Sequence, residues 1–329
     1  METDQTQEST ALTAGLSWDG SRADAFLFHE LPAVSRTRIR QKVLTGEARL
    51  NGHRFSTATR LRAGDVITVT WLSAPPAAAE SPDFPILYED DHLLIVDKPA
   101  GAATHPVGAR QEGTVVQFAR RHLEDRIRRS LEKGDRSFYP TVVNRLDVLT
   151  SGIVVLALDR GTHRALQAMA GSREMHRDYV ALVEGKLDAQ EGEIALPLAF
   201  SRNSVVKLKM AVRDDGRPSL TRYEVLELLP GHTLVRVFPE TGRQHQIRVH
   251  FAAIGHPVAG DLLYKDEQLF LAALEARRLQ RAGSSAPASR HALHAERVRF
   301  MNPASGAEID VRSELPEDFL QMVRAVSPP

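Results

Sequence analysis

Short apolar segments separated by turn residues fill the N-terminal part of the chain. Ile39 and Val43 lie four positions apart, which is the spacing of one helix face. Asn51-Gly52 predicts a tight hairpin, because both residues accept the positive φ angles that such a turn requires. The strands that we predict around this turn and after it are residues 48–50, 53–55 and 66–71. Residues 15–73 are therefore predicted to form a compact α+β module.

Three segments lack a periodic apolar pattern. Residues 1–14 begin with a polar and acidic sequence, and we expect them to be a disordered tail. Residues 74–86 are rich in proline and alanine, a composition typical of a linker, so we place a domain boundary there. Residues 271–289 are rich in alanine and arginine, and we expect an insertion or a mobile loop.

Helical and strand patterns are mixed through residues 87–329. The predicted strands are residues 92–97, 153–158, 178–184, 221–229, 233–238 and 297–300, and the predicted helices are residues 114–133, 160–170, 243–255 and 266–281. In the third helix, residues 241–244 fit a capping box, and Ile247, Phe251 and Ile254 share one apolar face. This mixture predicts an α+β fold with a largely antiparallel mixed sheet flanked by helices.

The composition excludes several kinds of site. The 329 residues include no cysteine, which rules out disulfides, thiolate zinc sites, iron–sulfur clusters and cysteine nucleophiles. The longest strongly apolar run, residues 153–158, is far shorter than the ~20 residues of a membrane-spanning helix. The polar first residues also lack the pattern of a secretory signal. We therefore expect a cytoplasmic protein.

Positive charge is concentrated in the predicted N-terminal module. The whole chain is neutral, with 42 basic and 42 acidic residues, but residues 33–62 carry a local charge of +7. The basic residues of this segment are Arg36, Arg38, Arg40, Lys42, Arg49, Arg54, Arg60 and Arg62. Such a block is typical of a nucleic-acid-binding surface, and equally of an ordinary solvated face. Charge alone leaves both interpretations open.

Residues 144–152, NRLDVLTSG, are the first candidate for a reactive site. They place Arg145 and Asp147 two positions apart, immediately before a strongly apolar predicted strand. The small hydroxyl residues and the glycine that follow can offer local hydrogen bonds and hold the carboxylate rigidly at the entry to the strand. Taken alone, the arginine and the aspartate would be interpreted as a surface salt bridge.

Common cofactor and metal motifs are absent from the sequence. It contains no dinucleotide-binding glycine loop, no Walker loop, no serine-hydrolase elbow and no HExxH motif. His245, His250 and His256 are five and six positions apart, which does not place two of them on one helix turn as metal binding would require. We therefore expect neither a metal nor a cofactor.

Four ordered motifs resemble those of the RluA/RluD family of pseudouridine synthases. NRLDVLTSG resembles the catalytic loop of the family, and ILYEDDHLLIVDKPAGAATHP resembles its opening strand pair. RDYVALVEG is similar to its tyrosine motif, and TGRQHQIRVHFAAIGHPVAGDLLY to its basic third motif. The N-terminal module resembles the small RNA-binding module named after ribosomal small-subunit protein four. The resemblance therefore implies a synthase domain over residues 87–329, preceded by an RNA-binding module over residues 15–73.

The resemblance also implies roles for individual residues. Asp147 matches the catalytic aspartate, Tyr179 the aromatic residue that packs on the target uracil, and Arg248 the basic partner of the aspartate. Arg145 matches an arginine that inserts where the flipped base had been. The implied contacts to RNA in the N-terminal module come from Arg36, Arg38, Arg40 and Lys42. The chain departs from the family at Asn144, where histidine is common, and at Gln244, where threonine or serine is commoner.

These matches imply an enzyme that isomerises defined uridines in structured RNA, without a cofactor. We expect large-subunit rRNA as the substrate, with tRNA as the other candidate, and a monomeric protein. The aspartate acts as a nucleophile or as the base of a glycal route, and the sequence leaves that choice open. One alternative is a non-catalytic RNA-binding factor in ribosome assembly that retains the fold. A glycosidase fits poorly, because no second acid stands out near Asp147.

Overall fold

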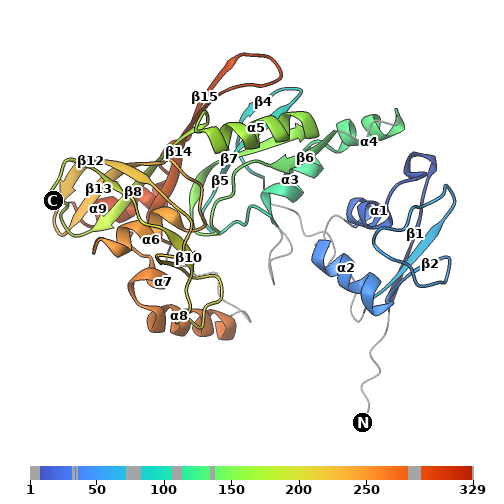
Figure 1. Cartoon of the computed structure of the whole chain (residues 1–329), viewed down its shortest axis with the longest axis horizontal. Coiled ribbons are helices and arrows are strands. Elements are labelled where there is room, and N and C mark those ends of the chain that lie inside the picture. The colour runs from blue at the N-terminus through green and yellow to red at the C-terminus, as the bar shows by residue number, and fades with distance from the viewer. Residues whose placement is uncertain are drawn as a thin grey trace, which may run out of the picture. The chain divides into compact units, whose positions relative to one another are not determined.

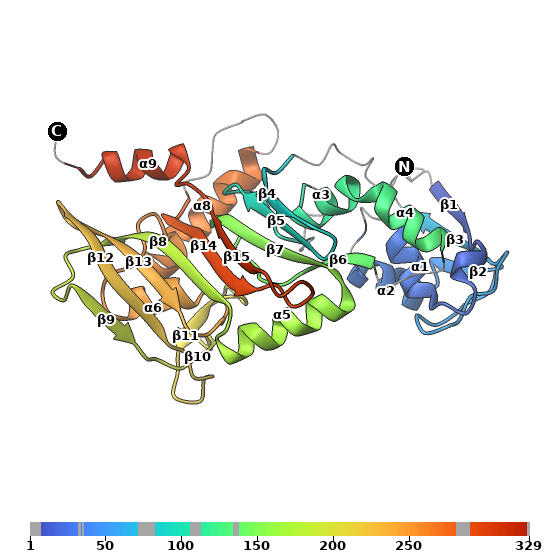
Figure 2. The same cartoon turned by 90° about the horizontal axis from the view of Figure 1, so that it is seen from above.

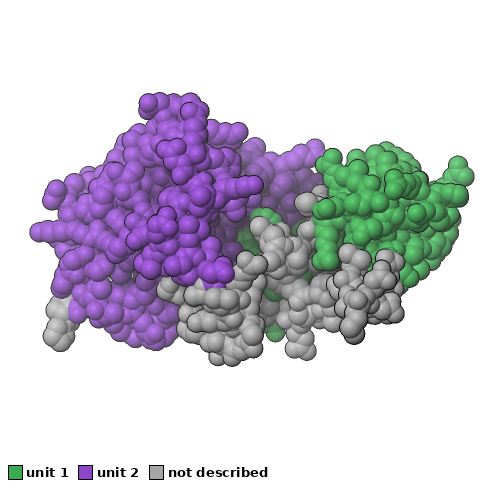
Figure 3. All heavy atoms as spheres, turned by 90° about the horizontal axis from the view of Figure 1, so that it is seen from below, with its two compact units in different colours: residues 1–83, 103–140 green, residues 84–102, 141–329 purple. Residues whose placement is uncertain are grey.

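The chain divides into two compact units (Figure 3). The computed structural model describes residues 8–31, 34, 36–71, 83–105, 113–133, 138–280 and 290–327 (Figure 1). Unit 1 holds residues 1–83 and 103–140, and unit 2 holds residues 84–102 and 141–329. Residues 103–140 therefore group with the N-terminal residues, although they follow the predicted linker. Three parts of the predicted irregular segments lie outside the described residues, namely 1–7, 74–82 and 281–289.

Unit 1 contains an antiparallel sheet in the order β1–β3–β2. Its strands are β1 (Glu8–Thr13), β2 (Ala48–Leu50) and β3 (Val66–Trp71). β1 corrects the expectation of a tail up to residue 14, because it pairs with β3 along its whole length and Leu12 packs against the core. The predicted strand 53–55 is reduced to one bridge, between Leu50 and His53.

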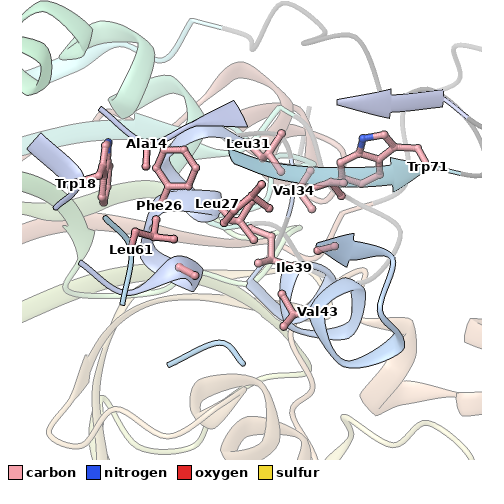
Figure 4. Close-up of a cluster of buried hydrophobic side chains, with 14 residues drawn as sticks. Ala14, Trp18, Phe26, Leu27, Leu31, Val34, Ile39, Val43, Leu61 and Trp71 are labelled. Carbon is pink, nitrogen blue, oxygen red and sulfur yellow. The ribbon is translucent and has the colours of Figure 1, made fainter. Parts of the chain in front are cut away.

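Two helices and one 3-10 turn complete the core of the N-terminal module. They are η1 (Leu16–Trp18), α1 (Ala23–Glu30) and α2 (Arg36–Thr45). Ile39 and Val43 are both buried, as the predicted helix face requires. They join a cluster in which the rings of Trp18 and Phe26 meet edge to face, with centroids 5.4 Å apart (Figure 4). The residues of this module thus form a hydrophobic core of their own.

The predicted helix 114–133 is divided into two. These are α3 (Val115–His122) and α4 (Glu124–Glu132). Thr114 begins the first of them with a capping box, in which its hydroxyl accepts the backbone N–H of Gln117 at 3.3 Å. The division lies at Leu123, which is 1% exposed and packs into the core.

Unit 2 is built on a ten-stranded, mostly antiparallel sheet, which confirms the predicted fold class. Its main path runs β4–β5–β7–β14–β8–β13–β12–β9, β15 pairs with β14, and β6 pairs with β7. The bounds are β4 (Ile86–Glu89), β5 (Leu93–Lys98), β6 (Phe138–Val142), β7 (Ser151–Asp159), β8 (His176–Glu184), β9 (Glu191–Ile194), β12 (Thr221–Leu229), β13 (His232–Pro239), β14 (Leu293–Met301) and β15 (Glu308–Arg312). The short pairing of β14 with β7 is parallel.

Helices cover this sheet. α5 (Arg160–Ser172) packs against β7 (Figure 2) through Leu166, and it begins where the side chain of Asp159 accepts the N–H of Thr162 at 2.9 Å. The other helices are α6 (Gln246–Ala253), α7 (Leu262–Lys265), α8 (Glu267–Gln280) and α9 (Glu317–Arg324). A separate two-stranded sheet joins β10 (Leu198–Phe200) to β11 (Met210–Val212).

The beginning of α6 differs from the sequence-based prediction. The helix starts at Gln246 rather than at residue 243, and no side chain caps its first turn. Thr241 does not form the predicted capping box, because its hydroxyl donates to the side-chain carbonyl of Gln246 at 2.7 Å. Ile247 and Phe251 are buried as predicted, whereas Ile254 is 38% exposed because it lies beyond the last turn of the helix.

Candidate active site

The loop between β6 and β7 carries Asp147, and Asn144 anchors its first half. The side-chain amide of Asn144 donates to the carbonyl of Ile153 at 3.0 Å and accepts the N–H of Val155 at 2.7 Å. These two bonds continue the pattern of a β-ladder beside β7, so they fix the chain just before the carboxylate. Asn144, the departure from the family pattern, therefore supports the loop from inside.

The second half of the loop is held at the end of β5. The ammonium of Lys98 is fully buried and donates to the carbonyls of Pro99, Ala102 and Val148 at 3.0–3.3 Å. The backbone N–H of Gly101 also donates to the carbonyl of Val148, at 2.7 Å. Because these bonds reach the residue after Asp147, the loop is fixed on both sides of the carboxylate.

Gly152 allows β7 to approach β14 closely at this point. Its φ angle is +108°, a conformation that favours glycine. A Cβ atom built there would lie 2.2 Å from the carbonyl oxygen of Ala295, which is a backbone clash. The glycine of the NRLDVLTSG segment is therefore required by the parallel contact between β7 and β14.

Arg248 on α6 joins Asp147 to a second carboxylate. Its Nη1 donates to Oδ2 of Asp147 at 2.7 Å, while Nε and Nη2 bind the two oxygens of Asp261 at 2.5 and 2.8 Å. The side chains of Arg248 and Asp261 are 8% and 1% exposed, whereas that of Asp147 is 28% exposed. Asp261 thus orients the guanidinium from the buried side, and the carboxylate of Asp147 remains accessible.

The charges around Asp147 keep its carboxyl group ionised. Burial alone would raise its pKa, but His245, Arg248 and His291, the imidazoles when protonated at low pH, lower the pKa to about 2. Burial lowers the pKa of both imidazoles, that of His291 to about 3. The histidines are therefore neutral at pH 7, where Arg248 supplies the permanent charge beside Asp147.

His245 and Tyr264 contact Asp147 and Arg248. His245 precedes α6 in the left-handed conformation, with φ +54°, and its Nε2 lies 3.7 Å from Oδ1 of Asp147. Its Nδ1 is 2.7 Å from the hydroxyl of Tyr264, and that hydroxyl accepts the N–H of Met210 at 3.0 Å. The ring of Tyr264 lies against the guanidinium of Arg248, 5.0 Å from its centroid.

Buried hydrogen bonds also hold the residues between Asp147 and β7. The hydroxyl of Thr150 bonds Nε2 of His291 at 2.7 Å. Arg290 donates to the hydroxyl of Ser151 at 2.7 Å, and that hydroxyl also lies 2.8 Å from Nδ1 of His294. The hydroxyls of Thr150 and Ser151 are therefore bound to residues at or just before the start of β14, while the backbone N–H of Thr150 donates to the carbonyl of Asp147 at 3.1 Å.

Tyr179 lies on β8 within electrostatic range of Asp147. Its side chain is 8% exposed, and burial together with the negative charge of Asp147 raises the pKa of its hydroxyl. The hydroxyl is therefore neutral at pH 7. Arg145, by contrast, is exposed, and no hydrogen bond or ion pair holds its side chain within the described part of the chain.

The basic residues of the N-terminal module differ in their surroundings. Lys42 is 9% exposed, and its ammonium binds Glu47 at 2.9 Å and the carbonyl of Thr70 at 2.8 Å. Arg38 lies over the ring of Trp71, and Arg40 is exposed. The side chain of Arg36 lies outside the described residues. Lys42 thus stabilises the module from inside, whereas Arg40 is open to solvent.

Sequence reasoning missed three residues of this site: His245, Asp261 and Tyr264. His245 was considered only as a metal ligand. Its place three residues before Arg248 in the sequence could have indicated that it lies in the same site. Asp261 and Tyr264 belong to the third motif, but nothing in their local pattern points to Asp147.

No group of three potential ligands placed to hold a metal ion occurs among the residues that the structure describes. None of the described helices is long and apolar enough to cross a membrane.

Comparisons with known proteins identify relatives of the chain. The family model described as RNA pseudouridylate synthase matches residues 92–253. Ribosomal large subunit pseudouridine synthase D of Xanthomonas campestris pv. campestris is 36% identical, over 93% of this chain and 89% of that protein. Ribosomal large subunit pseudouridine synthase C of Vibrio cholerae is 34% identical, over 90% of each chain.

Solved structures show the same fold. Human RNA Pseudouridylate Synthase Domain Containing 4 superposes with a TM-score of 0.53 at 22% identity, covering 73% of this chain and 92% of that chain. Human RNA Pseudouridylate Synthase Domain Containing 1 gives a TM-score of 0.52 at 22% identity, covering 76% and 98%.

Proposed function

Because the chain belongs to the RNA pseudouridylate synthase family, we propose that it converts uridines of large-subunit rRNA into pseudouridine with Asp147 as the catalytic carboxylate. The observation that carries this proposal is the ion pair between Asp147 and Arg248, at 2.7 Å in an accessible part of unit 2. The rRNA substrate is suggested by the names of the relatives from Xanthomonas campestris and Vibrio cholerae.

The reaction requires a carboxylate and no net oxidation. The bond between N1 of uracil and C1′ of ribose breaks, the base rotates, and a bond between C5 and C1′ forms. C5 loses a proton and N1 gains one, so atoms and electrons balance within the nucleotide. Asp147 is ionised, so it can attack C1′ as a nucleophile or remove the proton from C2′ as a base. In either route the reacting group is an oxygen of the Asp147 carboxylate.

The two oxygens of Asp147 are not equivalent. Oδ2 accepts the hydrogen bond of Arg248, whereas Oδ1 accepts no hydrogen bond from the described residues and lies 3.7 Å from Nε2 of His245. We therefore assign the reaction to Oδ1. We assign the uracil-packing role to Tyr179, which is 8% exposed, interacts electrostatically with Asp147 and keeps a neutral hydroxyl.

Extrusion of a base from folded RNA costs a few kcal/mol, which contacts to the RNA must offset. Arg145 is exposed two residues before Asp147, a position from which it can fill the space that the flipped base leaves. Residues 15–73 supply phosphate contacts in this proposal, from the exposed Arg40 and from Arg38, which is partly exposed and lies over the ring of Trp71. We also propose that the protein is a monomer and acts in the cytoplasm.

The test compares pseudouridine maps of cellular RNA from cells that produce either the wild-type protein or Asp147→Ala. Carbodiimide labelling and primer extension should show loss of discrete large-subunit rRNA sites in the variant. Asp188→Ala, at an exposed aspartate outside the site, serves as the matched control and should preserve the map. An identical map with Asp147→Ala would instead favour the non-catalytic assembly factor. Loss of pseudouridine sites in tRNA alone would show that the substrate is tRNA and not large-subunit rRNA.

A further inference from the structure

His245 occupies a left-handed backbone conformation. Its φ angle of +54° is uncommon for residues other than glycine, although histidine, asparagine and aspartate adopt this region more often than the rest. Non-glycine residues in that region cost of order 1 kcal/mol or more and persist where the surroundings determine them. The conformation directs the imidazole to the space between Asp147 and Tyr264, with one ring nitrogen facing each.

The donors and acceptors around the hydroxyl of Tyr264 indicate which nitrogen of His245 carries the proton. The hydroxyl of Tyr264 accepts the backbone N–H of Met210 at 3.0 Å, and Nδ1 of His245 is 2.7 Å away. A backbone N–H can only donate, so the hydroxyl proton is available for Nδ1. A neutral imidazole that accepts at Nδ1 carries its own proton on Nε2, the nitrogen that faces Oδ1 of Asp147.

From this arrangement we infer that His245 and Tyr264 are positioning residues for the reacting oxygen of Asp147. The hydroxyl of Tyr264 holds the imidazole so that Nε2–H points to Oδ1, while Arg248 binds Oδ2. Each oxygen of the carboxylate then faces one N–H donor, and rotation of the carboxylate about its Cβ–Cγ bond is restricted. The inference rests on the proposed function, because it concerns the oxygen to which that reaction is assigned.

Tyr264 is suited to this task because it contacts both partners of Asp147. Its ring supports the guanidinium of Arg248, and its hydroxyl orients His245. The amide of Met210 fixes the hydroxyl from the side of β11, so a neighbouring strand takes part in the arrangement. Asp147, Arg248 and Asp261 are the charged groups that act on the imidazole. Arg248 is bound to both carboxylates. Each of these three charged groups therefore has an ion-pair partner next to the neutral imidazole of His245.

Two substitutions of His245 separate this role from a structural one. Glutamine can place an N–H donor near the position of Nε2, but it has no acceptor at the position of Nδ1. Asparagine can accept from Tyr264 near Nδ1, but it does not reach Asp147, and it tolerates the left-handed conformation better than glutamine does. A merely structural role therefore predicts that His245→Asn is the milder change. The positioning role predicts the opposite.

The measurement is single-turnover release of tritium from rRNA that carries [5-³H]uridine. We expect His245→Asn to lower the rate at saturating enzyme by about 10-fold, because the 3.7 Å between Nε2 and Oδ1 is an electrostatic contact longer than a hydrogen bond. His245→Gln should retain a rate within about 5-fold of wild type, and the RNA concentration dependence should be unchanged in both. Tyr264→Phe keeps the ring against Arg248 and should reduce the rate about 10-fold.

A double substitution and a spectroscopic measurement complete the test. In the His245→Gln background, Tyr264→Phe should cause no further loss, because no Nδ1 acceptor remains. The ¹⁵N chemical shifts of His245 in the wild-type protein should show a protonated Nε2 and an unprotonated Nδ1. Melting curves of all variants should coincide within a few degrees, which shows that they are folded.

Several outcomes would overturn the inference. These are a rate for His245→Asn equal to or above that of His245→Gln, additive losses in the double variant, or a protonated Nδ1. If wild-type protein released no tritium, the proposed function would fail as well. If wild-type protein were active, Asp147→Ala inactive and both His245 variants fully active, the present inference alone would fail.

Discussion

Replacing Arg248 by methionine is expected to destabilise the fold and to move the acidic limb of the pH–rate profile upward. The guanidinium binds Asp147 through Nη1 at 2.7 Å and Asp261 through Nη2 at 2.8 Å. Methionine has a similar length and no charge. The substitution therefore leaves both carboxylates in the site without their common counter-charge.

The magnitude follows from the burial of the three groups. Removal of one partner from a buried ion pair costs about 3–5 kcal/mol of the free energy of unfolding. Asp261 is 1% exposed and carries most of this cost, whereas Asp147 is 28% exposed and regains some hydration. We expect a loss of about 3 kcal/mol. Adding Asp261→Asn removes the buried charge and should restore at least about 1 kcal/mol.

The pH dependence has a definite sign. Burial alone raises the pKa of Asp147, and the surrounding positive charges, Arg248 among them, bring it to about 2. In the folded wild-type protein this carboxylate contributes stability above its unfolded pKa of ~3.9, and that contribution is lost as the pH falls toward about 2. Without Arg248 the folded pKa rises. The ionised, reactive form of Asp147 is then lost at a higher pH.

Urea unfolding at neutral pH measures the stability, and tritium release from [5-³H]uridine-labelled rRNA between about pH 4 and 7 measures the acidic limb. Arg222→Met is the matched control, because Arg222 forms a 2.7 Å pair with Glu193 at the surface, where both side chains are about half exposed. The control should leave the free energy of unfolding nearly unchanged. A loss for Arg248→Met no larger than that of the control, with an unmoved acidic limb, would refute the reasoning.

Three further changes test other parts of the structure. Gly152→Ala should cost at least about 3 kcal/mol in urea unfolding, because its Cβ would meet the carbonyl of Ala295 at 2.2 Å and its φ is positive; a loss under about 1 kcal/mol would contradict this. The pKa of buried His291 is lowered to about 3, so the folded protein should lose about 1.4 kcal/mol per pH unit from this group as the pH falls from about 6 to 4. His291→Gln should remove that slope in unfolding experiments at several pH values, and equal slopes would exclude the linkage. Replacing Arg38 and Arg40 by glutamine should reduce the slope of log affinity for single-stranded RNA against log salt by ~0.7 per lost phosphate contact, whereas an unchanged slope would place both outside the RNA interface.

Elements with strong local patterns were predictable from the sequence. The run at 153–158 is apolar at every position because both faces of β7 are buried. Such a continuous apolar run is recognisable as a buried strand without any alternation of polar and apolar residues. Ile39 and Val43 marked the buried face of α2 by their spacing. β1 was missed because the first residues are polar, and its stability comes from pairing with β3, more than fifty residues away.

Boundaries and caps depended on contacts that the local sequence does not contain. Residues 241–244 have the composition of a capping box, yet Thr241 binds Gln246 and α6 begins after the left-handed His245. There the tertiary contacts outweigh a local capping preference of about 1 kcal/mol. The helix predicted over residues 114–133 is divided at the buried Leu123.

The sequence by itself determined the α+β class, the position of the Asp147 loop and, through the resemblance of four motifs, the family. It marked Asp147 and Arg248 as candidate site residues because each lies in a contiguous motif. Only the tertiary structure decided which oxygen of Asp147 is bound, that Asp261 holds Arg248 from behind, and that Tyr264 orients His245. These groups are separated by up to about a hundred residues along the chain, and such contacts form only when the sheet brings β7, α6 and α7 together.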